Sequence, residues 1–72
     1  MSIYREDDTI VDTIHNRLFE ARMQTAVPDD DGNTRFNLFV TAPTYVAAFN
    51  ELRSWALDVN EGITIKSLDE VL

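Results

Sequence analysis

The sequence predicts a single small α+β domain over residues 1–72, with two layers and the element order α-β-β-α-β. Three observations support this fold class. Two segments have apolar residues at helical spacing, three short runs are rich in β-branched and aromatic residues, and a dense turn signal separates two of those runs. The economical assembly is a three-stranded sheet with both helices on one face. The alternative is two helices on two strands, if the first helix continues to Gln24.

The first helix is predicted from about Asp8 to about Phe19. Apolar residues recur there at three- and four-residue steps, at Ile10, Val11, Ile14, Leu18 and Ala21. Asp7, Asp8 or Thr9 can cap the N-terminus, where a carboxylate also interacts favourably with the helix dipole. The residues before this helix contain too little apolar surface to form an element of their own, although Ile3 and Tyr4 fit a short segment at a sheet edge.

A β-hairpin is predicted next. The residues after the first helix alternate as a strand does, with apolar or β-branched side chains at Phe19, Ala21, Met23, Thr25 and Val27. They predict a strand from about Ala21 to Val27. The following sequence, PDDDGN, is typical of a turn, and the run FNLFV after it again has strand character. Two strands joined by such a turn form a hairpin.

The stretch Thr34–Lys66 is predicted to form a strand, a helix and a strand, which is a βαβ unit. Thr41 or Thr44 can cap the helix, and Gly62 ends it. The run ITI predicts the last strand, and the terminal SLDEVL either extends it or hangs free. The helix is predicted from an apolar stripe with a tryptophan at its edge: Tyr45, Ala48, Phe49, Leu52, Ala56 and Val59, with Trp55.

Charge is the most distinctive feature of the composition. The chain has 13 acidic and 6 basic residues and a formal net charge of −7. A field of this sign repels free nucleic acid and anionic membranes and attracts basic protein surfaces. The chain has no cysteine, and no apolar run approaches the roughly 20 residues that span a bilayer. We therefore expect a cytoplasmic protein that binds neither nucleic acid nor membrane directly.

No pattern in the chain is typical of a catalytic, metal or cofactor site. The acidic run Asp29–Asn33 suggests calcium, but when Gly32 takes the glycine position of a calcium loop, Leu38 stands where the closing glutamate belongs. His15, with Asp12 one turn earlier, is the candidate acid-base pair, and no serine or threonine stands in a nucleophile motif. We therefore expect no enzyme activity, no metal and no cofactor.

The expected partner-binding residues are carboxylates in separate groups, together with the tryptophan. If folding brings two acidic groups onto one face, the array resembles the phosphates of a duplex and suits a basic, nucleic-acid-binding surface of another protein. A tryptophan at a helix edge is the kind of residue found in interface hot spots. The predicted set is Asp7, Asp8, Asp12, Asp29, Asp30, Asp31, Trp55, Asp58 and Glu61.

In size, acidity and lack of cysteine the chain resembles small phage-encoded inhibitors of host machinery, such as anti-CRISPR proteins and RNA polymerase inhibitors. The stretch FNLFVTAPTYVAAFNELRSWALDVNEGITI is similar in pattern to an inhibitor of the polymerase kind. Charge and the lack of catalytic motifs predict a non-enzymatic binding protein that docks on a basic surface. The resemblance implies that the surface belongs to a host nucleic-acid-processing complex, and that the protein acts in the host cytoplasm if a phage encodes it.

The alternative function is that of a structural or assembly subunit that self-associates, for example as a homodimer. Phe36, Leu38 and Val40 alternate with Asn37 and Phe39, so that apolar side chains are expected on both faces of the sheet. A two-layer domain covers one face only, and an oligomer would bury the other.

Overall fold

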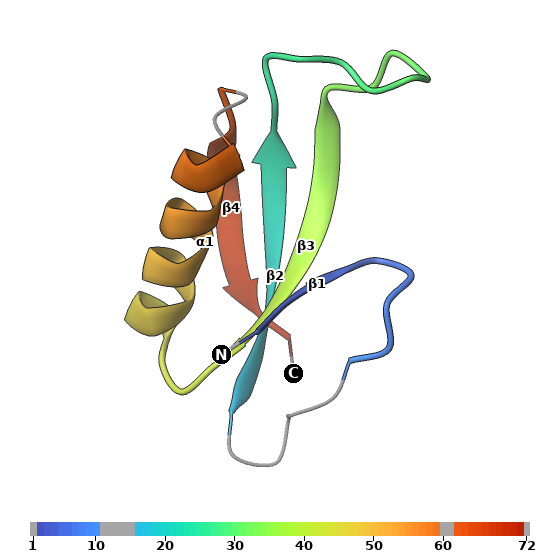
Figure 1. Cartoon of the computed structure of the whole chain (residues 1–72). Helices are drawn as coiled ribbons and strands as arrows, with labels where there is room; N and C mark the ends of the chain where they lie inside the picture. Colours follow the sequence, from blue (N-terminus) through green and yellow to red (C-terminus); the bar gives the residue numbers. More distant parts are fainter. Residues whose placement is uncertain (1, 11–15, 60–61, 72) are drawn as a thin grey trace.

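The computed structural model describes residues 2–10, 16–59 and 62–71. These residues form a four-stranded sheet with one helix across one of its faces (Figure 1). In space the strands follow the order β1-β3-β2-β4, and every neighbouring pair is antiparallel. The elements are β1 (Ser2–Arg5), β2 (Arg17–Gln24), β3 (Arg35–Ala42), α1 (Tyr45–Val59) and β4 (Thr64–Glu70).

The predicted α-β-β-α-β order with a three-stranded sheet and two helices is wrong, and so is the alternative of two helices on two strands. The error lies in the helix predicted over Asp8–Phe19. Arg17 and the two residues after it form the start of β2. Asp8 belongs to a turn after β1, where its Oδ2 accepts the backbone N–H of Arg5 at 2.9 Å. Residues 11–15 of the predicted helix lie outside the described residues.

β2 is the centre of the sheet, and its alternation explains why this segment is a strand. Phe19, Ala21 and Met23 are at most 1% exposed, whereas Arg22 between them is exposed. Strands on both sides pair with β2. As a strand it can therefore bury its apolar face and also form hydrogen bonds with its backbone N–H and C=O groups. The core contains Phe19, Ala21, Met23, Leu38, Val40, Ala42, Ala48, Leu52 and Leu68.

The predicted hairpin is confirmed, although β2 begins and ends before the predicted bounds of Ala21 and Val27. β1 is the short edge segment that Ile3 and Tyr4 fit. Ile3 packs against the core, and β1 pairs with β3 only over Leu38–Thr41. On that side, no described strand pairs with Arg35–Asn37 of β3, and this stretch lines the cleft described below.

The predicted helix and last strand are confirmed. The Oγ1 atom of Thr44 accepts the backbone N–H of Ala47 at 3.1 Å and so caps α1. Gly62, with φ of 66°, leads the chain back into β4, which includes most of the terminal SLDEVL. β3 and β4 are each antiparallel to β2 between them, so they run parallel to each other. The unit β3-α1-β4 is thus a βαβ unit with β2 inserted.

Candidate partner-binding cleft

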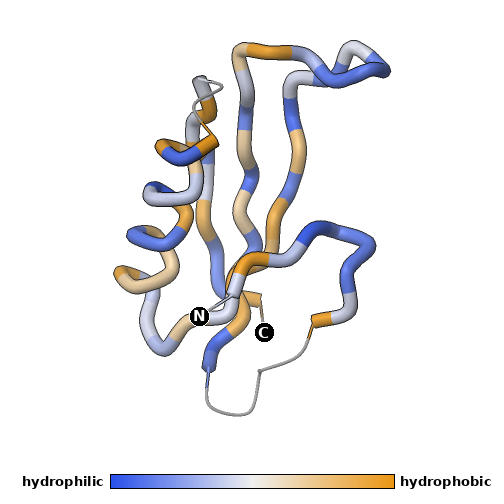
Figure 2. The backbone as a smooth tube through the Cα atoms, viewed as in Figure 1, coloured by the Kyte–Doolittle hydropathy of each residue, from blue (hydrophilic) through white to orange (hydrophobic). Residues whose placement is uncertain are grey.

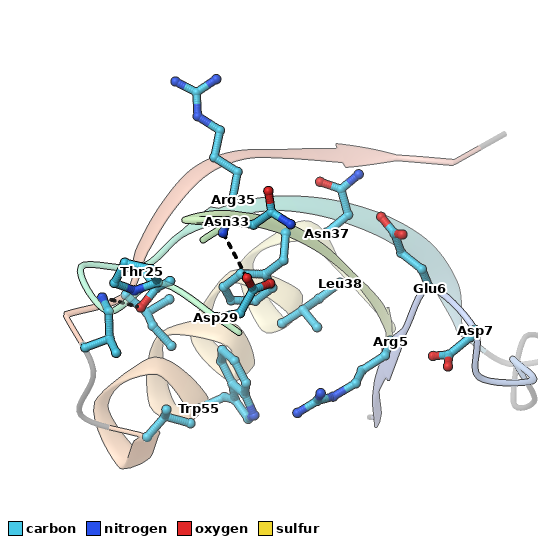
Figure 3. Close-up of a pocket in the computed structure, with 15 residues that line it drawn as sticks. Arg5, Glu6, Asp7, Thr25, Asp29, Asn33, Arg35, Asn37, Leu38 and Trp55 are labelled. Atoms are coloured by element: carbon cyan, nitrogen blue, oxygen red, sulfur yellow. Dashed lines mark hydrogen bonds between the residues drawn. The ribbon is translucent and has the colours of Figure 1, made fainter. Parts of the chain in front are cut away.

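A single helix leaves part of this sheet uncovered, and the uncovered part forms a cleft. An α-helix with its side chains is about 10–12 Å wide and strands lie about 4.8 Å apart, so one helix does not span four strands. α1 packs against β3 and β4, and β1 ends at Arg5. A cleft of about 740 Å³ lies between β3, α1, the turn after β1 and the β2–β3 loop (Figure 3).

The floor of the cleft is apolar. Phe36 and Leu38 come from β3, Trp55 and Val59 from α1, and Ile63 from the residues just before β4. The rings of Phe36 and Trp55 meet edge to face, with centroids 6.1 Å apart and planes at 66°. Aromatic pairs favour this geometry. Trp55 is held in place on one side and remains half-buried.

The rim of the cleft is mainly acidic. Glu6 and Asp7 from the turn after β1 and Asp29 from the β2–β3 loop all line it, and all three are exposed. Figure 2 shows the turn after β1 and the tip of the β2–β3 loop as hydrophilic, whereas the start of that loop is hydrophobic. Arg5 and Arg35 are the basic residues that line the cleft. The side chain of Arg5 points toward Trp55, whereas the side chains of Arg35 and Glu6 point away from it (Figure 3). Asp7 and Asp29, which are far apart in the sequence, therefore both line a cleft with an apolar floor.

Asp29 also holds the β2–β3 loop in shape. Its Oδ1 accepts the backbone N–H groups of Asp31, at 3.0 Å, and Asn33, at 2.8 Å. Its own N–H donates to the carbonyl of Asn33 at 3.0 Å, and its carbonyl accepts the N–H of Gly32 at 2.9 Å. Asp30 and Asp31 are exposed at this tip. The acidic side chains of the loop thus project from a turn that hydrogen bonds of the Asp29 side chain and backbone hold in shape.

β3 exposes an unpaired backbone edge to the cleft. Because β1 pairs only with Leu38–Thr41, no described strand pairs with Arg35–Asn37 on that side. The side chains of Arg35 and Asn37 point to the sheet face opposite Trp55 (Figure 3), as expected for residues that alternate with Phe36 and Leu38. Both residues nevertheless line the cleft. It is therefore their backbone that faces it.

The structure brings part of the predicted binding set together. Asp7, Asp29 and Trp55 line the same cleft, and Asp30 and Asp31 lie in the loop that borders it. These residues come from three separate parts of the chain. Asp7 and Asp29, from two of the predicted acidic groups, thus line one cleft.

The rest of the predicted set does not join this cleft. Asp8 is exposed in the turn after β1, where its carboxylate is bonded to the backbone. Asp58 is exposed in the last turn of α1 and does not line the cleft. Asp12 and Glu61 lie outside the described residues, and so does His15, the other member of the candidate acid-base pair.

Sequence reasoning missed Arg5, Phe36 and the backbone edge of β3. A signal existed for Arg5, because the alternation of Ile3 and Arg5 places both side chains on the core side if the segment is a strand. No local sequence pattern predicts the unpaired edge of β3, because this edge results from the difference in length between β1 and β3.

Within the described part of the chain, no group of three or more His, Asp or Glu side chains is arranged to hold a metal ion. In the same residues, no helix has the length and apolarity that crossing a membrane requires. Comparison of the chain with protein-family models, curated proteins and solved structures finds no significant match.

Proposed function

We propose that this is a non-enzymatic binding protein that docks a basic surface of a partner protein against the cleft and its acidic rim. The observation that carries the proposal is that Asp7 and Asp29, from separate parts of the chain, both line a cleft whose apolar floor contains Trp55. Interfaces commonly combine a desolvated aromatic anchor with a polar rim. Here the anchor supplies affinity, and the carboxylates select a basic partner and steer its approach.

The partner surface that fits best is one that normally binds nucleic acid. Such surfaces carry lysines and arginines placed to meet phosphates, and a carboxylate array offers charges of the same sign. A protein seated there excludes the nucleic acid and acts as an inhibitor of the complex. This is the action expected of the phage-encoded inhibitors that the chain resembles in size and charge.

Two charge variants test the proposal, and both change the net charge from −7 to −3 by removing four carboxylates. The rim variant spares Asp8 and Asp29, whose carboxylates hold turns. Asp30 and Asp31 are included because they lie in the loop that borders the cleft, and the control variant removes four carboxylates outside both the cleft and this loop. The rim variant is Glu6→Gln, Asp7→Asn, Asp30→Asn and Asp31→Asn, and the control is Glu20→Gln, Glu51→Gln, Asp58→Asn and Asp69→Asn.

The measurement is capture of proteins from a lysate of the host organism at about 0.05 M and about 0.5 M salt, because exposed charges are screened over about 10 Å at 0.1 M. We expect the unmodified protein and the control to retain the same basic partner at low salt and to release it at high salt. The rim variant should fail to retain it. Equal retention by the rim and control variants, or no basic partner for the unmodified protein, contradicts the proposal.

A second candidate is self-association through the outer surface of α1. Val46 is 66% exposed, Leu57 70% and Phe49 37%. Phe49 and Leu57 also border a shallow groove of about 400 Å³ beside β4, with Ile65 on its other side. Exposed apolar surface of this kind is typical of interfaces. Light scattering tests this candidate: a dimer that Leu57→Glu converts to a monomer supports it, and a monomer across micromolar concentrations contradicts it.

The face of the sheet opposite α1 is a poorer place for self-association than the sequence suggests. Phe39 is half-buried there and Thr41 is fully buried. Arg22 and Arg35 lie exposed on the same face. Glu20 and Asp69 lie on this face as well, and charged side chains are depleted from the cores of interfaces.

A further inference from the structure

We propose that two copies of this chain associate through the outer edge of β4, so that their sheets join into one, with Leu68 of each copy at the two-fold axis. In this register Lys66 of each copy lies opposite Glu70 of the other. The inference rests on the second candidate function, self-association, and not on docking of a basic partner. It specifies the surface and the register through which the copies meet.

The backbone of β4 provides the first part of the argument. β4 is the last strand in the order β1-β3-β2-β4, and no described strand pairs with its outer edge (Figure 1). The N–H of Val71, directly after β4, donates to the carbonyl of Leu18 at 2.8 Å, so Val71 faces β2. Because successive residues of a strand direct these groups to opposite edges, Leu68 and Glu70 direct theirs outward. An unpaired edge of this kind is a template for a second strand.

Charge provides the second part. Lys66 is exposed and has no Cα partner on β2, because the ladder between β2 and β4 is irregular at this point. Asp69 and Glu70, toward the other end of the strand, are exposed as well. β4 thus has a basic position in one half and acidic positions in the other. Two antiparallel copies of such a strand bring opposite charges together.

The same charges select the register. Pairing centred on Leu68 places Glu70 opposite Lys66 of the second copy, and the symmetry repeats this contact. Pairing centred one residue later places the two Asp69 carboxylates directly opposite each other, which is unfavourable. Pairing centred one residue earlier places Lys66 opposite the apolar Leu68. A lysine on a strand edge hinders pairing with an unrelated strand, and of these three registers the one centred on Leu68 gives it a carboxylate.

The flank of α1 beside β4 provides the third part. Phe49 and Leu57 border the groove of about 400 Å³ that Ile65 of β4 also lines. α1 packs against β3 and β4, so its axis lies near β2, between them. Joining the sheets places the two α1 axes about three strand spacings apart, roughly 14 Å, on the same side of the sheet. A helix with its side chains is about 10–12 Å wide, so large side chains such as Phe49 and Leu57 are needed to fill the space between the helices.

The joined sheet leaves the cleft of each copy open. Residues of β3, α1 and the turn after β1 line the cleft, whereas β4 lies at the edge of the sheet opposite to β1. The dimer therefore presents two clefts, and self-association and partner docking can be measured separately.

Two charge-reversal variants, Lys66→Glu and Glu70→Lys, test the register. Each variant alone places like charges opposite each other at both symmetric contacts, whereas in a mixture of the two every introduced charge meets an opposite charge. We expect the unmodified protein to dimerise at about 0.15 M salt, where exposed charges further apart than about 8 Å are screened. Each variant alone should dimerise about tenfold or more weakly, and the equimolar mixture should form a mixed dimer. Sedimentation equilibrium measures the dissociation constants, and an affinity tag on one variant identifies the mixed dimer.

Arg17→Gln is the matched control, because Glu70 also forms an ion pair within its own chain, with the Arg17 Nε and the Glu70 Oε2 3.5 Å apart. Loss of this pair alone should leave the dimer intact. A loss of dimer in Arg17→Gln as large as in Glu70→Lys assigns the effect of Glu70 to its own chain and overturns the register.

The remaining outcomes separate the strand edge from self-association in general. A dimer that Leu57→Glu abolishes and both charge-reversal variants retain upholds association through α1 and overturns the joined sheet. Failure of the two variants to form a mixed dimer overturns the register as well. A monomer across micromolar concentrations overturns the inference together with the second candidate function, and leaves docking of a basic partner to the test of the rim variant.

Discussion

At the scale of single residues, neighbours of the same type have different roles. Asp29 and Asp30 are adjacent acidic residues in one loop, but the Asp29 carboxylate accepts two backbone N–H bonds within that loop. We expect Asp29→Ala to lower the free energy of unfolding by about 1 kcal/mol, because these donors lose their acceptor. Asp30→Ala, the matched control, should change it by less than about 0.5 kcal/mol. Urea denaturation measures both, and equal effects would show that the loop does not depend on Asp29.

The two glycines form a second such pair. Gly32 and Gly62 both have positive φ, of 81° and 66°. A Cβ atom at Gly32 meets nothing within 4 Å, whereas one at Gly62 comes within 2.9 Å of the Ala26 Cβ. We expect Gly32→Ala to destabilise the protein by about 1–2 kcal/mol through its backbone alone, and Gly62→Ala by about 1 kcal/mol more through the clash.

Ala26→Gly provides the control for the steric part of this prediction. In that background the added methyl group at position 62 no longer meets the Ala26 Cβ, so the two alanine substitutions should become similar in effect. Thermal or urea denaturation measures the difference. A Gly62→Ala penalty that persists unchanged in the Ala26→Gly background would refute the close approach of the two segments.

At the scale of elements, α1 is defined by which face it buries. Leu52 is fully buried and Leu57 is 70% exposed on the same helix. Leu52→Ala should lower the free energy of unfolding by about 2–4 kcal/mol, because it leaves a cavity in the core. Leu57→Ala should change it by less than about 0.5 kcal/mol. Comparable losses at both positions would mean that α1 is rotated about its axis.

The elements that sequence reasoning predicted correctly are those with a complete local signal. α1 has its stripe and its cap at Thr44, and the hairpin has PDDDGN between two strand-like runs. The start of β2 lacked such a signal, because Leu18 fits a helical spacing with Ile10 and Ile14 while Phe19 fits the strand alternation with Ala21. Pairing with β3 and β4 favours the strand over the helix for this segment. That pairing depends on residues far away in the sequence, so a local pattern does not reveal it.

The site was predictable in its residue types but only partly in its position. The acidic groups and Trp55 are readable from the sequence. Their convergence depends on β1 docking beside β3, and four residues of strand carry too little information to predict that docking. The unpaired edge at Arg35–Asn37 follows from the difference in length between two strands far apart in the chain.

At the scale of the whole molecule, the cleft follows from the ratio of one helix to four strands among the described residues. A single helix lies on a four-stranded sheet, so the sheet is covered over only part of its width. The uncovered part near β1 carries the acidic rim, and the net charge of −7 favours approach of a basic partner from that side. The fold thus leaves the cleft open to solvent.

The measurement that tests the central claim most directly is chemical-shift mapping of the partner isolated by salt elution onto isotope-labelled protein. The account predicts that the largest changes fall on the backbone amides of Phe36, Asn37 and Asp7 and on the indole N–H of Trp55, which is unique in the spectrum. The amides of α1 around Val46 should stay unchanged. Changes confined to the outer surface of α1, with the cleft residues unaffected, would contradict the account.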